Sequence, residues 1–129
     1  MALTSFAGNL HGPVEVGQIF VVSGKTIDGA MNLIINLTSG KVGEVDIPFH
    51  FSVRFHNENI VRNSLIEQAW GEEEVEENIF SSPNPIICGW DFKVYILAGD
   101  ERFHIAINDQ PFCTYNYRLP LEEIHAIQV

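Results

Sequence analysis

The chain is poor in basic residues and in cysteine, and it lacks a long hydrophobic run. Lys and Arg number 7 against 17 Asp and Glu, which gives a formal net charge of −10 at pH 7. Nucleic acids and anionic membrane surfaces repel such a charge, so neither is expected as a partner. No stretch reaches the roughly 20 apolar residues of a membrane-spanning helix, so direct insertion into a bilayer is not expected either.

The two cysteines, Cys88 and Cys113, do not suggest a disulfide framework. Residues 1–10 lack both the basic start and the apolar run of a signal peptide, which predicts synthesis in the cytosol. In that reducing compartment two free thiols are favoured over a disulfide.

Metal-binding patterns are also missing from the sequence. Four of the histidines are too scattered for a metal cluster, namely His11, His56, His104 and His125. No loop of Asp, Asn and Gly has the spacing of calcium ligands. We therefore expect no metal and no cofactor.

What the chain does contain is a series of short runs rich in Val, Ile, Phe and Leu, separated by turn residues. These runs predict strands at approximately 19–22, 32–37, 45–55, 60–65, 70–76, 92–98, 102–107, 110–115 and 124–129. One helical turn is expected at Leu121–Glu123, after Pro120. So many short strands predict an all-β fold of two packed antiparallel sheets, and 129 residues fit a single domain with one core.

The run from Phe49 to Phe55 alternates between aromatic or aliphatic residues and polar ones. In a strand, His50, Ser52 and Arg54 share one face and the apolar residues share the other, so one face is polar and the other is core. The polar turn 56–59 then predicts an antiparallel hairpin with the run 60–65, which brings Asn63 beside the polar row.

Two further residues complete a site suited to a neutral sugar. The flat indole of Trp70 can cover the apolar C–H face of a sugar ring while the polar row takes its hydroxyls. Glu73 can accept hydrogen bonds from Arg54 and hold the guanidinium in one orientation. These residue types in this order predict carbohydrate binding.

At these positions the chain resembles the galectins, the β-galactoside-binding lectins, whose signature reads H-x-N-x-R, V-x-N and W-x-x-E-x-R. The resemblance extends over nearly the whole chain, and several segments outside the site follow in galectin order. They are Ser23–Lys25, Leu33–Leu37, Phe103–Asn108 and Arg118–Ile124.

The resemblance implies a jelly-roll sandwich that binds galactose-containing glycans of glycoproteins or glycolipids. It implies that His50 and Arg54 bind the axial 4-hydroxyl of galactose, that Asn63 and Glu73 bind the 6-hydroxyl, and that Trp70 stacks on the ring. It also implies a cytoplasmic protein with a pool that leaves the cell by an unconventional route.

Two positions of the site depart from the family pattern. Ser52 replaces the usual Asn with a shorter hydroxyl, and Val75 replaces the second Arg, which reaches the second sugar of a disaccharide. Affinity for lactose-type ligands is therefore expected to fall by roughly ten- to a hundredfold, or specificity to shift. The alternative is a galectin-like module that works through protein contacts with little or no sugar binding.

Each residue of the site also has a plainer interpretation. Trp70 could be a core residue, as Trp90 is expected to be in the core or at its rim, and Arg54 with Glu73 could be a surface ion pair. The acidic run Glu72–Glu77 is expected to be an exposed strand or loop except at Glu73.

Catalysis would need an activated nucleophile or two facing carboxylates, and an Arg partner keeps Glu73 ionised. We therefore expect no enzyme, with a glycoside hydrolase as the minor alternative.

The region 1–129 is expected to be a single galectin-type domain. Galectin domains usually continue for about one strand beyond the segment matching Ile124–Val129, so the usual last strand is expected to be absent here. Because that strand often lies at the dimer contact of the family, a homodimer stays open as a partner.

Overall fold

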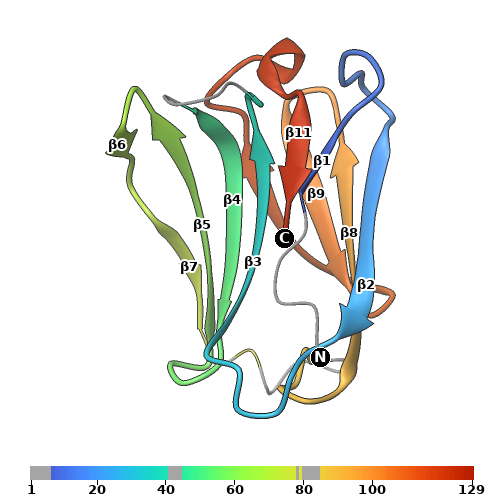
Figure 1. Cartoon of the computed structure of the whole chain (residues 1–129), viewed down its shortest axis with the longest axis vertical. Helices are drawn as coiled ribbons and strands as arrows, with labels where there is room; N and C mark the ends of the chain where they lie inside the picture. Colours follow the sequence, from blue (N-terminus) through green and yellow to red (C-terminus); the bar gives the residue numbers. More distant parts are fainter. Residues whose placement is uncertain (1–6, 41–44, 78, 80–84) are drawn as a thin grey trace.

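The structure, a computed structural model, describes residues 7–40, 45–77, 79 and 85–129. Two antiparallel sheets face each other (Figure 1). In the first sheet the strands lie in the order β1 (Ala7–Asn9), β11 (Ala126–Gln128), β3 (Asn32–Thr38), β4 (Ile47–Arg54), β5 (Asn59–Ile66) and β6 (Ala69–Trp70), and β7 (Glu74–Glu76) also pairs with β5. The order in the second sheet is β10 (Gln110–Asn116), β9 (Arg102–Ile107), β8 (Asp91–Ala98) and β2 (Ile19–Lys25). The predicted two-sheet sandwich is confirmed.

The core lies between the sheets and is built by alternation along the strands. In β4, Phe49, Phe51 and Val53 are fully buried. The rings of Phe49 and Phe103, which belong to opposite sheets, have centroids 4.9 Å apart. Burial of one such side chain stabilises the fold by roughly 1.5–3 kcal/mol. Because successive side chains of a strand point to opposite faces, the residues between these three are turned to the outer face.

The predicted strands are present, with two differences. The single strand expected at 70–76 is wrong, because β6 ends at Trp70 and β7 begins only at Glu74. The sequence pattern does not predict β1, whose Ala-Gly-Asn sequence has little strand propensity and is held by pairing with β11. The expected helical turn is confirmed as the 3-10 helix η2 (Leu121–Glu123).

Three further expectations concern membranes, thiols and Trp90. No helix among the described residues has the length and hydrophobicity that a membrane crossing needs. Cys88 and Cys113 are free and partly buried. Trp90 lies in the turn before β8 and is 63% exposed, so a place in the core is wrong for this residue.

Candidate functional site

The predicted hairpin of β4 and β5 is confirmed, and its register assembles the polar row. The two strands pair antiparallel with Asn63 opposite His50. Cross-strand partners in an antiparallel pair lie on the same face, so Asn63 joins His50, Ser52 and Arg54 on the outer face of the first sheet.

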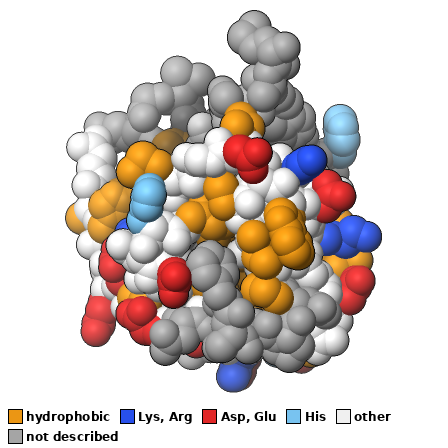
Figure 2. Space-filling model, turned by 90° about the horizontal axis from the view of Figure 1, so that it is seen from below, with side chains coloured by type: hydrophobic (Ala, Val, Ile, Leu, Met, Phe, Trp, Pro, Cys, Tyr) orange, Lys and Arg blue, Asp and Glu red, His pale blue; other side chains and the backbone are white. Residues whose placement is uncertain are grey.

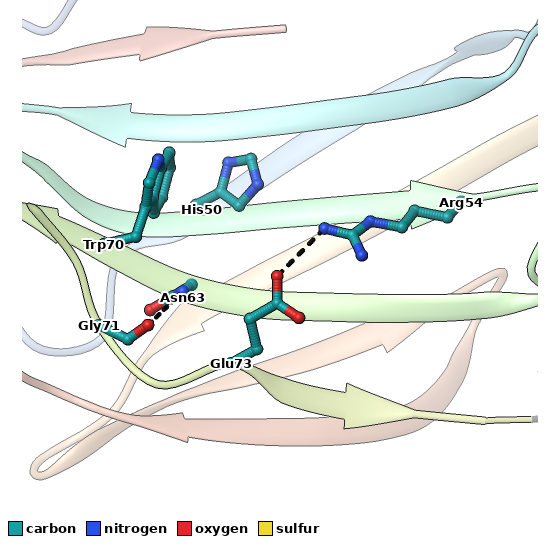
Figure 3. A pocket seen from close by; sticks show the side chains of 6 residues that line it. All are labelled: His50, Arg54, Asn63, Trp70, Gly71 and Glu73. Atoms are coloured by element: carbon teal, nitrogen blue, oxygen red, sulfur yellow. Dashed lines mark hydrogen bonds and ion pairs between the residues drawn. The ribbon is translucent and has the colours of Figure 1, made fainter.

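An open pocket lies on this outer face (Figure 3). Its lining residues are His50, Arg54, Asn63, Trp70, Gly71 and Glu73. The structure therefore brings together five of the six predicted site residues and adds a glycine. In the part of the chain that the structure describes, Ser52 does not line the pocket, and its side chain is only 3% exposed.

Trp70 stands at one wall of the pocket because of the tight turn before it. Glu67 and Gln68 connect β5 to β6 with positive φ angles of 51° and 66°, as in the two-residue turns that match the twist of paired strands. The turn pairs Trp70 with Leu65 and leaves the indole 51% exposed. The alternative of a core Trp70 is wrong, and the indole offers an apolar platform at the pocket.

His50 is held in one orientation by its neighbour on β3. Its Nδ1 lies 2.7 Å from Oδ1 of Asn36, and Nδ2 of Asn36 donates to Oε1 of Gln128 at 3.4 Å. With the amide oxygen of Asn36 turned to His50, Nδ1 carries the proton and Nε2 is left as an acceptor. Burial, with Arg54 adding to it and Glu73 opposing it, lowers the pKa of His50 below 6.5, so the ring is neutral at pH 7.

Arg54 and Glu73 form the opposite wall. Nη2 of Arg54 donates to Oε1 of Glu73 at 3.2 Å, drawn as the dashed line between them in Figure 3. Their side chains are 35% and 48% exposed, so the pair contributes little to stability. Its effect is to fix a positively charged donor and a negatively charged acceptor side by side at the pocket.

The pocket places hydrogen-bonding side chains beside the exposed indole of Trp70. Glu73 is held by the guanidinium of Arg54, at 3.2 Å. Away from the pocket, burial raises the pKa of the Cys113 thiol to about 12, so it does not act as a thiolate nucleophile at neutral pH. Within the described residues, no three His, Cys, Asp or Glu side chains group in a way that could hold a metal ion. The geometry suits reversible binding of a polyhydroxylated ligand with an apolar face.

Comparison with known proteins agrees with this geometry. The family model of galactoside-binding lectins matches residues 5–129. The chain belongs to the galectin family.

Two curated relatives of this galectin chain are both named 32 kDa β-galactoside-binding lectin. The lectin of Caenorhabditis elegans is 39% identical over 118 residues, which cover 89% of this chain and 40% of the relative. That of Haemonchus contortus is 36% identical over 122 residues, which cover 93% of this chain and 41% of the relative. The chain thus spans about two fifths of the length of these relatives.

Solved galectin structures share the fold. Sheep galectin-11 in complex with glycerol superposes with a TM-score of 0.83 at 18% identity, covering 99% of this chain and 90% of that chain. A variant of human galectin-16 superposes with a TM-score of 0.84 at 19% identity, covering 98% of this chain and 87% of that chain. At this identity the likeness shows the fold alone.

Behind the pocket of this galectin chain, Arg118 orients Asn63. Nη1 of Arg118 and the backbone N–H of Ser64 donate to Oδ1 of Asn63, at 2.9 and 2.8 Å. Nδ2 of Asn63 donates to the carbonyl oxygen of Gly71 at 2.9 Å. Both ends of the amide are thereby assigned, and one N–H of Nδ2 remains to donate into the pocket. The contact between Arg118 and Asn63 cannot be predicted from sequence spacing, because the two residues are 55 positions apart.

Arg118 also holds the segment that carries Glu73. Nη2 of Arg118 donates to the carbonyl oxygen of Glu72 at 2.8 Å and to Oε2 of Glu74 at 3.1 Å. The guanidinium approaches Gly71 so closely that a Cβ there would lie 2.7 Å from Nη1 of Arg118. A side chain at Gly71 would displace this guanidinium from its present position, so a glycine fits the close approach.

The acidic run is less exposed than expected, which corrects the prediction for two of its members. Nη2 of Arg62 lies 2.8 Å from Oε1 of Glu76, and Nη1 lies 3.8 Å from Oε1 of Glu74. The side chain of Arg62 is only 6% exposed, and it also donates to the carbonyl oxygen of Thr114 in the second sheet. Glu74 and Glu76 are thus turned toward a buried cation, and they fasten the short strand β7 to the sandwich.

Proposed function

We propose that this chain is a lectin domain that binds glycans ending in β-galactose through the pocket on the outer face of the first sheet. The observation that carries the proposal is the convergence of an exposed tryptophan, a neutral histidine with a free acceptor nitrogen and a paired arginine in one open pocket. Apolar and polar groups in this combination match the two chemically different faces of a sugar ring.

In the proposed complex each residue has a distinct role. Nε2 of His50 accepts from the axial 4-hydroxyl while the guanidinium of Arg54 donates to the same oxygen. Asn63 donates to the 6-hydroxyl and Glu73 accepts from it. Trp70 covers the C–H face of the ring. Because an axial 4-hydroxyl distinguishes galactose from glucose, selectivity rests on His50 and Arg54.

Affinity for simple lactose-type ligands is proposed to be weak. Ser52 is not among the residues that line the pocket, which supports an indirect role for its hydroxyl. Val75 cannot donate to a second sugar, and losing a charged hydrogen bond costs about 1.5–3 kcal/mol, or roughly ten- to a hundredfold in affinity. Exposed carboxylates such as Glu73 would also disfavour sialylated or sulfated glycans on that side of the pocket.

The proposed partners are galactose-ending glycans of glycoproteins or glycolipids. Such glycans face the outside of the cell, so the proposal includes an extracellular pool of a protein made in the cytosol. No nucleic acid is expected as a partner at a net charge of −10.

A glycan-array screen tests the proposal. Three proteins are compared: the parent chain, Trp70→Ala and Trp90→Ala. Trp90 is the matched control, because it is 63% exposed and lies outside the pocket. We expect galactose-ending glycans to bind the parent and Trp90→Ala, and Trp70→Ala to lose at least tenfold in affinity while it remains folded.

The array also distinguishes the alternative of a protein-interaction module. That alternative is supported by the two departures, Ser52 and Val75, which weaken the site. If the folded parent protein binds no glycan on the array, and lactose competes with none of its ligands, the interaction module is favoured over a lectin.

A further inference from the structure

A second row of side chains crosses the same outer face beside the pocket. The strand registers pair Ile34 with Ser52, Ser52 with Val61, and Val61 with Val75. Cross-strand partners share a face, so these four side chains run across β3, β4, β5 and β7. Three of the four are aliphatic, whereas the neighbouring pocket row is polar.

Only the two ends of this row are open to a ligand. Ile34 is 37% exposed and Val75 is 40% exposed, whereas Ser52 and Val61 are 3% and 1% exposed. The Arg54–Glu73 ion pair joins β4 to the segment before β7, and β5 lies between these two partners in the sheet. The row thus presents one exposed aliphatic side chain at each of its ends, Ile34 on β3 and Val75 on β7. Val75 is the one that lies on the side of Glu73.

Val75 is within reach of a group attached to a sugar in the pocket. Glu73 and Val75 are two positions apart in an extended segment, so their side chains leave the same face at a spacing of about 6–7 Å. In the proposed complex the 4-hydroxyl lies at His50 and Arg54 on β4. Carbon 4 and the anomeric carbon lie across the ring from each other, so the anomeric substituent points away from β4, toward the side of Glu73 and Val75.

We propose that Val75 forms an apolar subsite that selects β-galactosides whose anomeric substituent presents an apolar surface, such as an aryl group. This inference rests on the proposed function and names the ligand class of the same site. A polar second sugar finds no donor at this position, while an apolar group removes the exposed part of the valine side chain from water. Partial burial of one valine corresponds to about three- to tenfold in affinity.

The test is isothermal titration of methyl β-galactoside and 4-nitrophenyl β-galactoside into three proteins: the parent, Val75→Ser and Ile34→Ser. Ile34→Ser is the matched control, because Ile34 has nearly the same exposure and lies at the far end of the same row. We expect the parent to bind the aryl galactoside three- to tenfold more tightly than the methyl galactoside. Val75→Ser should bring that ratio close to one without changing the affinity for the methyl galactoside, and Ile34→Ser should keep the parent ratio.

The outcomes separate this inference from the proposed function. If the methyl galactoside binds and Val75→Ser keeps the aryl preference, or Ile34→Ser loses it equally, the subsite is overturned and the galactose pocket stands. If the folded parent binds neither galactoside, both proposals are overturned. Thermal unfolding of each variant confirms that Val75→Ser remains folded, as expected for an exposed residue of an edge strand.

Discussion

Oδ1 of Asn36 lies 2.7 Å from Nδ1 of His50, across the register of β3 and β4. This contact settles the chemistry of a residue that faces the pocket, because a histidine with Nδ1 occupied as a donor presents Nε2 as an acceptor. A hydroxyl of the ligand can then donate to His50 while Arg54 donates to the same hydroxyl oxygen. The orientation of Asn36 itself depends on Gln128 of β11, so three strands contribute to the state of one ring.

Replacing Asn36 should therefore weaken sugar binding although the proposed complex places no sugar contact on it. We expect Asn36→Ala to lose about three- to tenfold in affinity for methyl β-galactoside, the worth of one hydrogen bond of ordinary strength. The ¹⁵N chemical shifts of the His50 ring should show the Nδ1–H form in the parent and a mixture of tautomers in the variant. Asn116→Ala, an exposed strand residue of the other sheet, is the control. A single unchanged tautomer in Asn36→Ala would contradict this account.

The pH dependence of binding follows from the lowered pKa of His50. A base whose pKa lies below the ordinary value of 6.5 is mostly neutral at pH 6.5 and above, and it gains its proton as the pH falls through the lowered pKa. We therefore expect galactoside affinity to stay constant from pH 8 to about 6.5, and to decline only in more acidic solution. Titrations across this range, with the folded state checked by circular dichroism at each pH, measure the effect. A decline that begins above pH 6.5 would contradict the lowered pKa.

The outer face of β4 could be predicted because alternation is a local property. The residues at 49–55 alone indicate which side is core, and the polar turn 56–59 indicates where the neighbouring strand begins. The partners that orient the pocket could not be predicted in the same way. Asn36 and Gln128 reach the site through the pairing of distant strands, and Arg118 reaches it from the loop after β10. No spacing in the sequence encodes these contacts.

The error at 70–76 has a related cause. Between β6 and β7 the backbone is bound by distant side chains: the carbonyl oxygen of Gly71 accepts from Asn63, and that of Glu72 accepts from Arg118. A run of residues in the sequence does not reveal these partners. The sequence predicts an exposed strand or loop for the acidic run except at Glu73, because its cationic partners, Arg62 and Arg118, belong to other segments of the chain. A run of like charges is therefore a weak indicator of exposure when buried cations lie beneath it.

Arg118 should act on affinity through Asn63 and the segment of Glu73. Arg118→Met keeps an aliphatic chain over the ring of Tyr115 but removes the donors to Asn63, Glu72 and Glu74. We expect affinity for methyl β-galactoside to fall by about five- to fiftyfold, equivalent to about 1–2 kcal/mol for the hydrogen bonds that are lost. Affinity for the 6-deoxy analogue should fall much less, because Asn63 and Glu73 are proposed to bind the 6-hydroxyl.

Two further variants make the Arg118 experiment decisive. Arg102→Met removes an exposed arginine of the second sheet, and should leave both affinities unchanged. Gly71→Ala forces a Cβ to within 2.7 Å of Arg118 and should reproduce the loss, whereas the Cβ of Gly24→Ala meets Phe92 at an ordinary 3.6 Å. Equal losses for the two sugars in Arg118→Met would show that the arginine acts on the fold and not on the 6-hydroxyl contacts.

The buried cation Arg62 predicts a stability effect that is independent of sugar. In Glu76→Gln the guanidinium keeps the carbonyl oxygen of Thr114 and the more distant Glu74, but it loses the charged partner at 2.8 Å. We expect the free energy of unfolding to fall by about 1–2 kcal/mol, less than for a fully buried pair because Glu76 is 44% exposed. Glu101→Gln removes a surface partner of Arg102, and should change stability by less than about 0.5 kcal/mol. Urea unfolding of both variants measures the two changes in the free energy of unfolding. Equal changes would show that the ion pair with Glu76 does not offset the cost of burying the Arg62 charge.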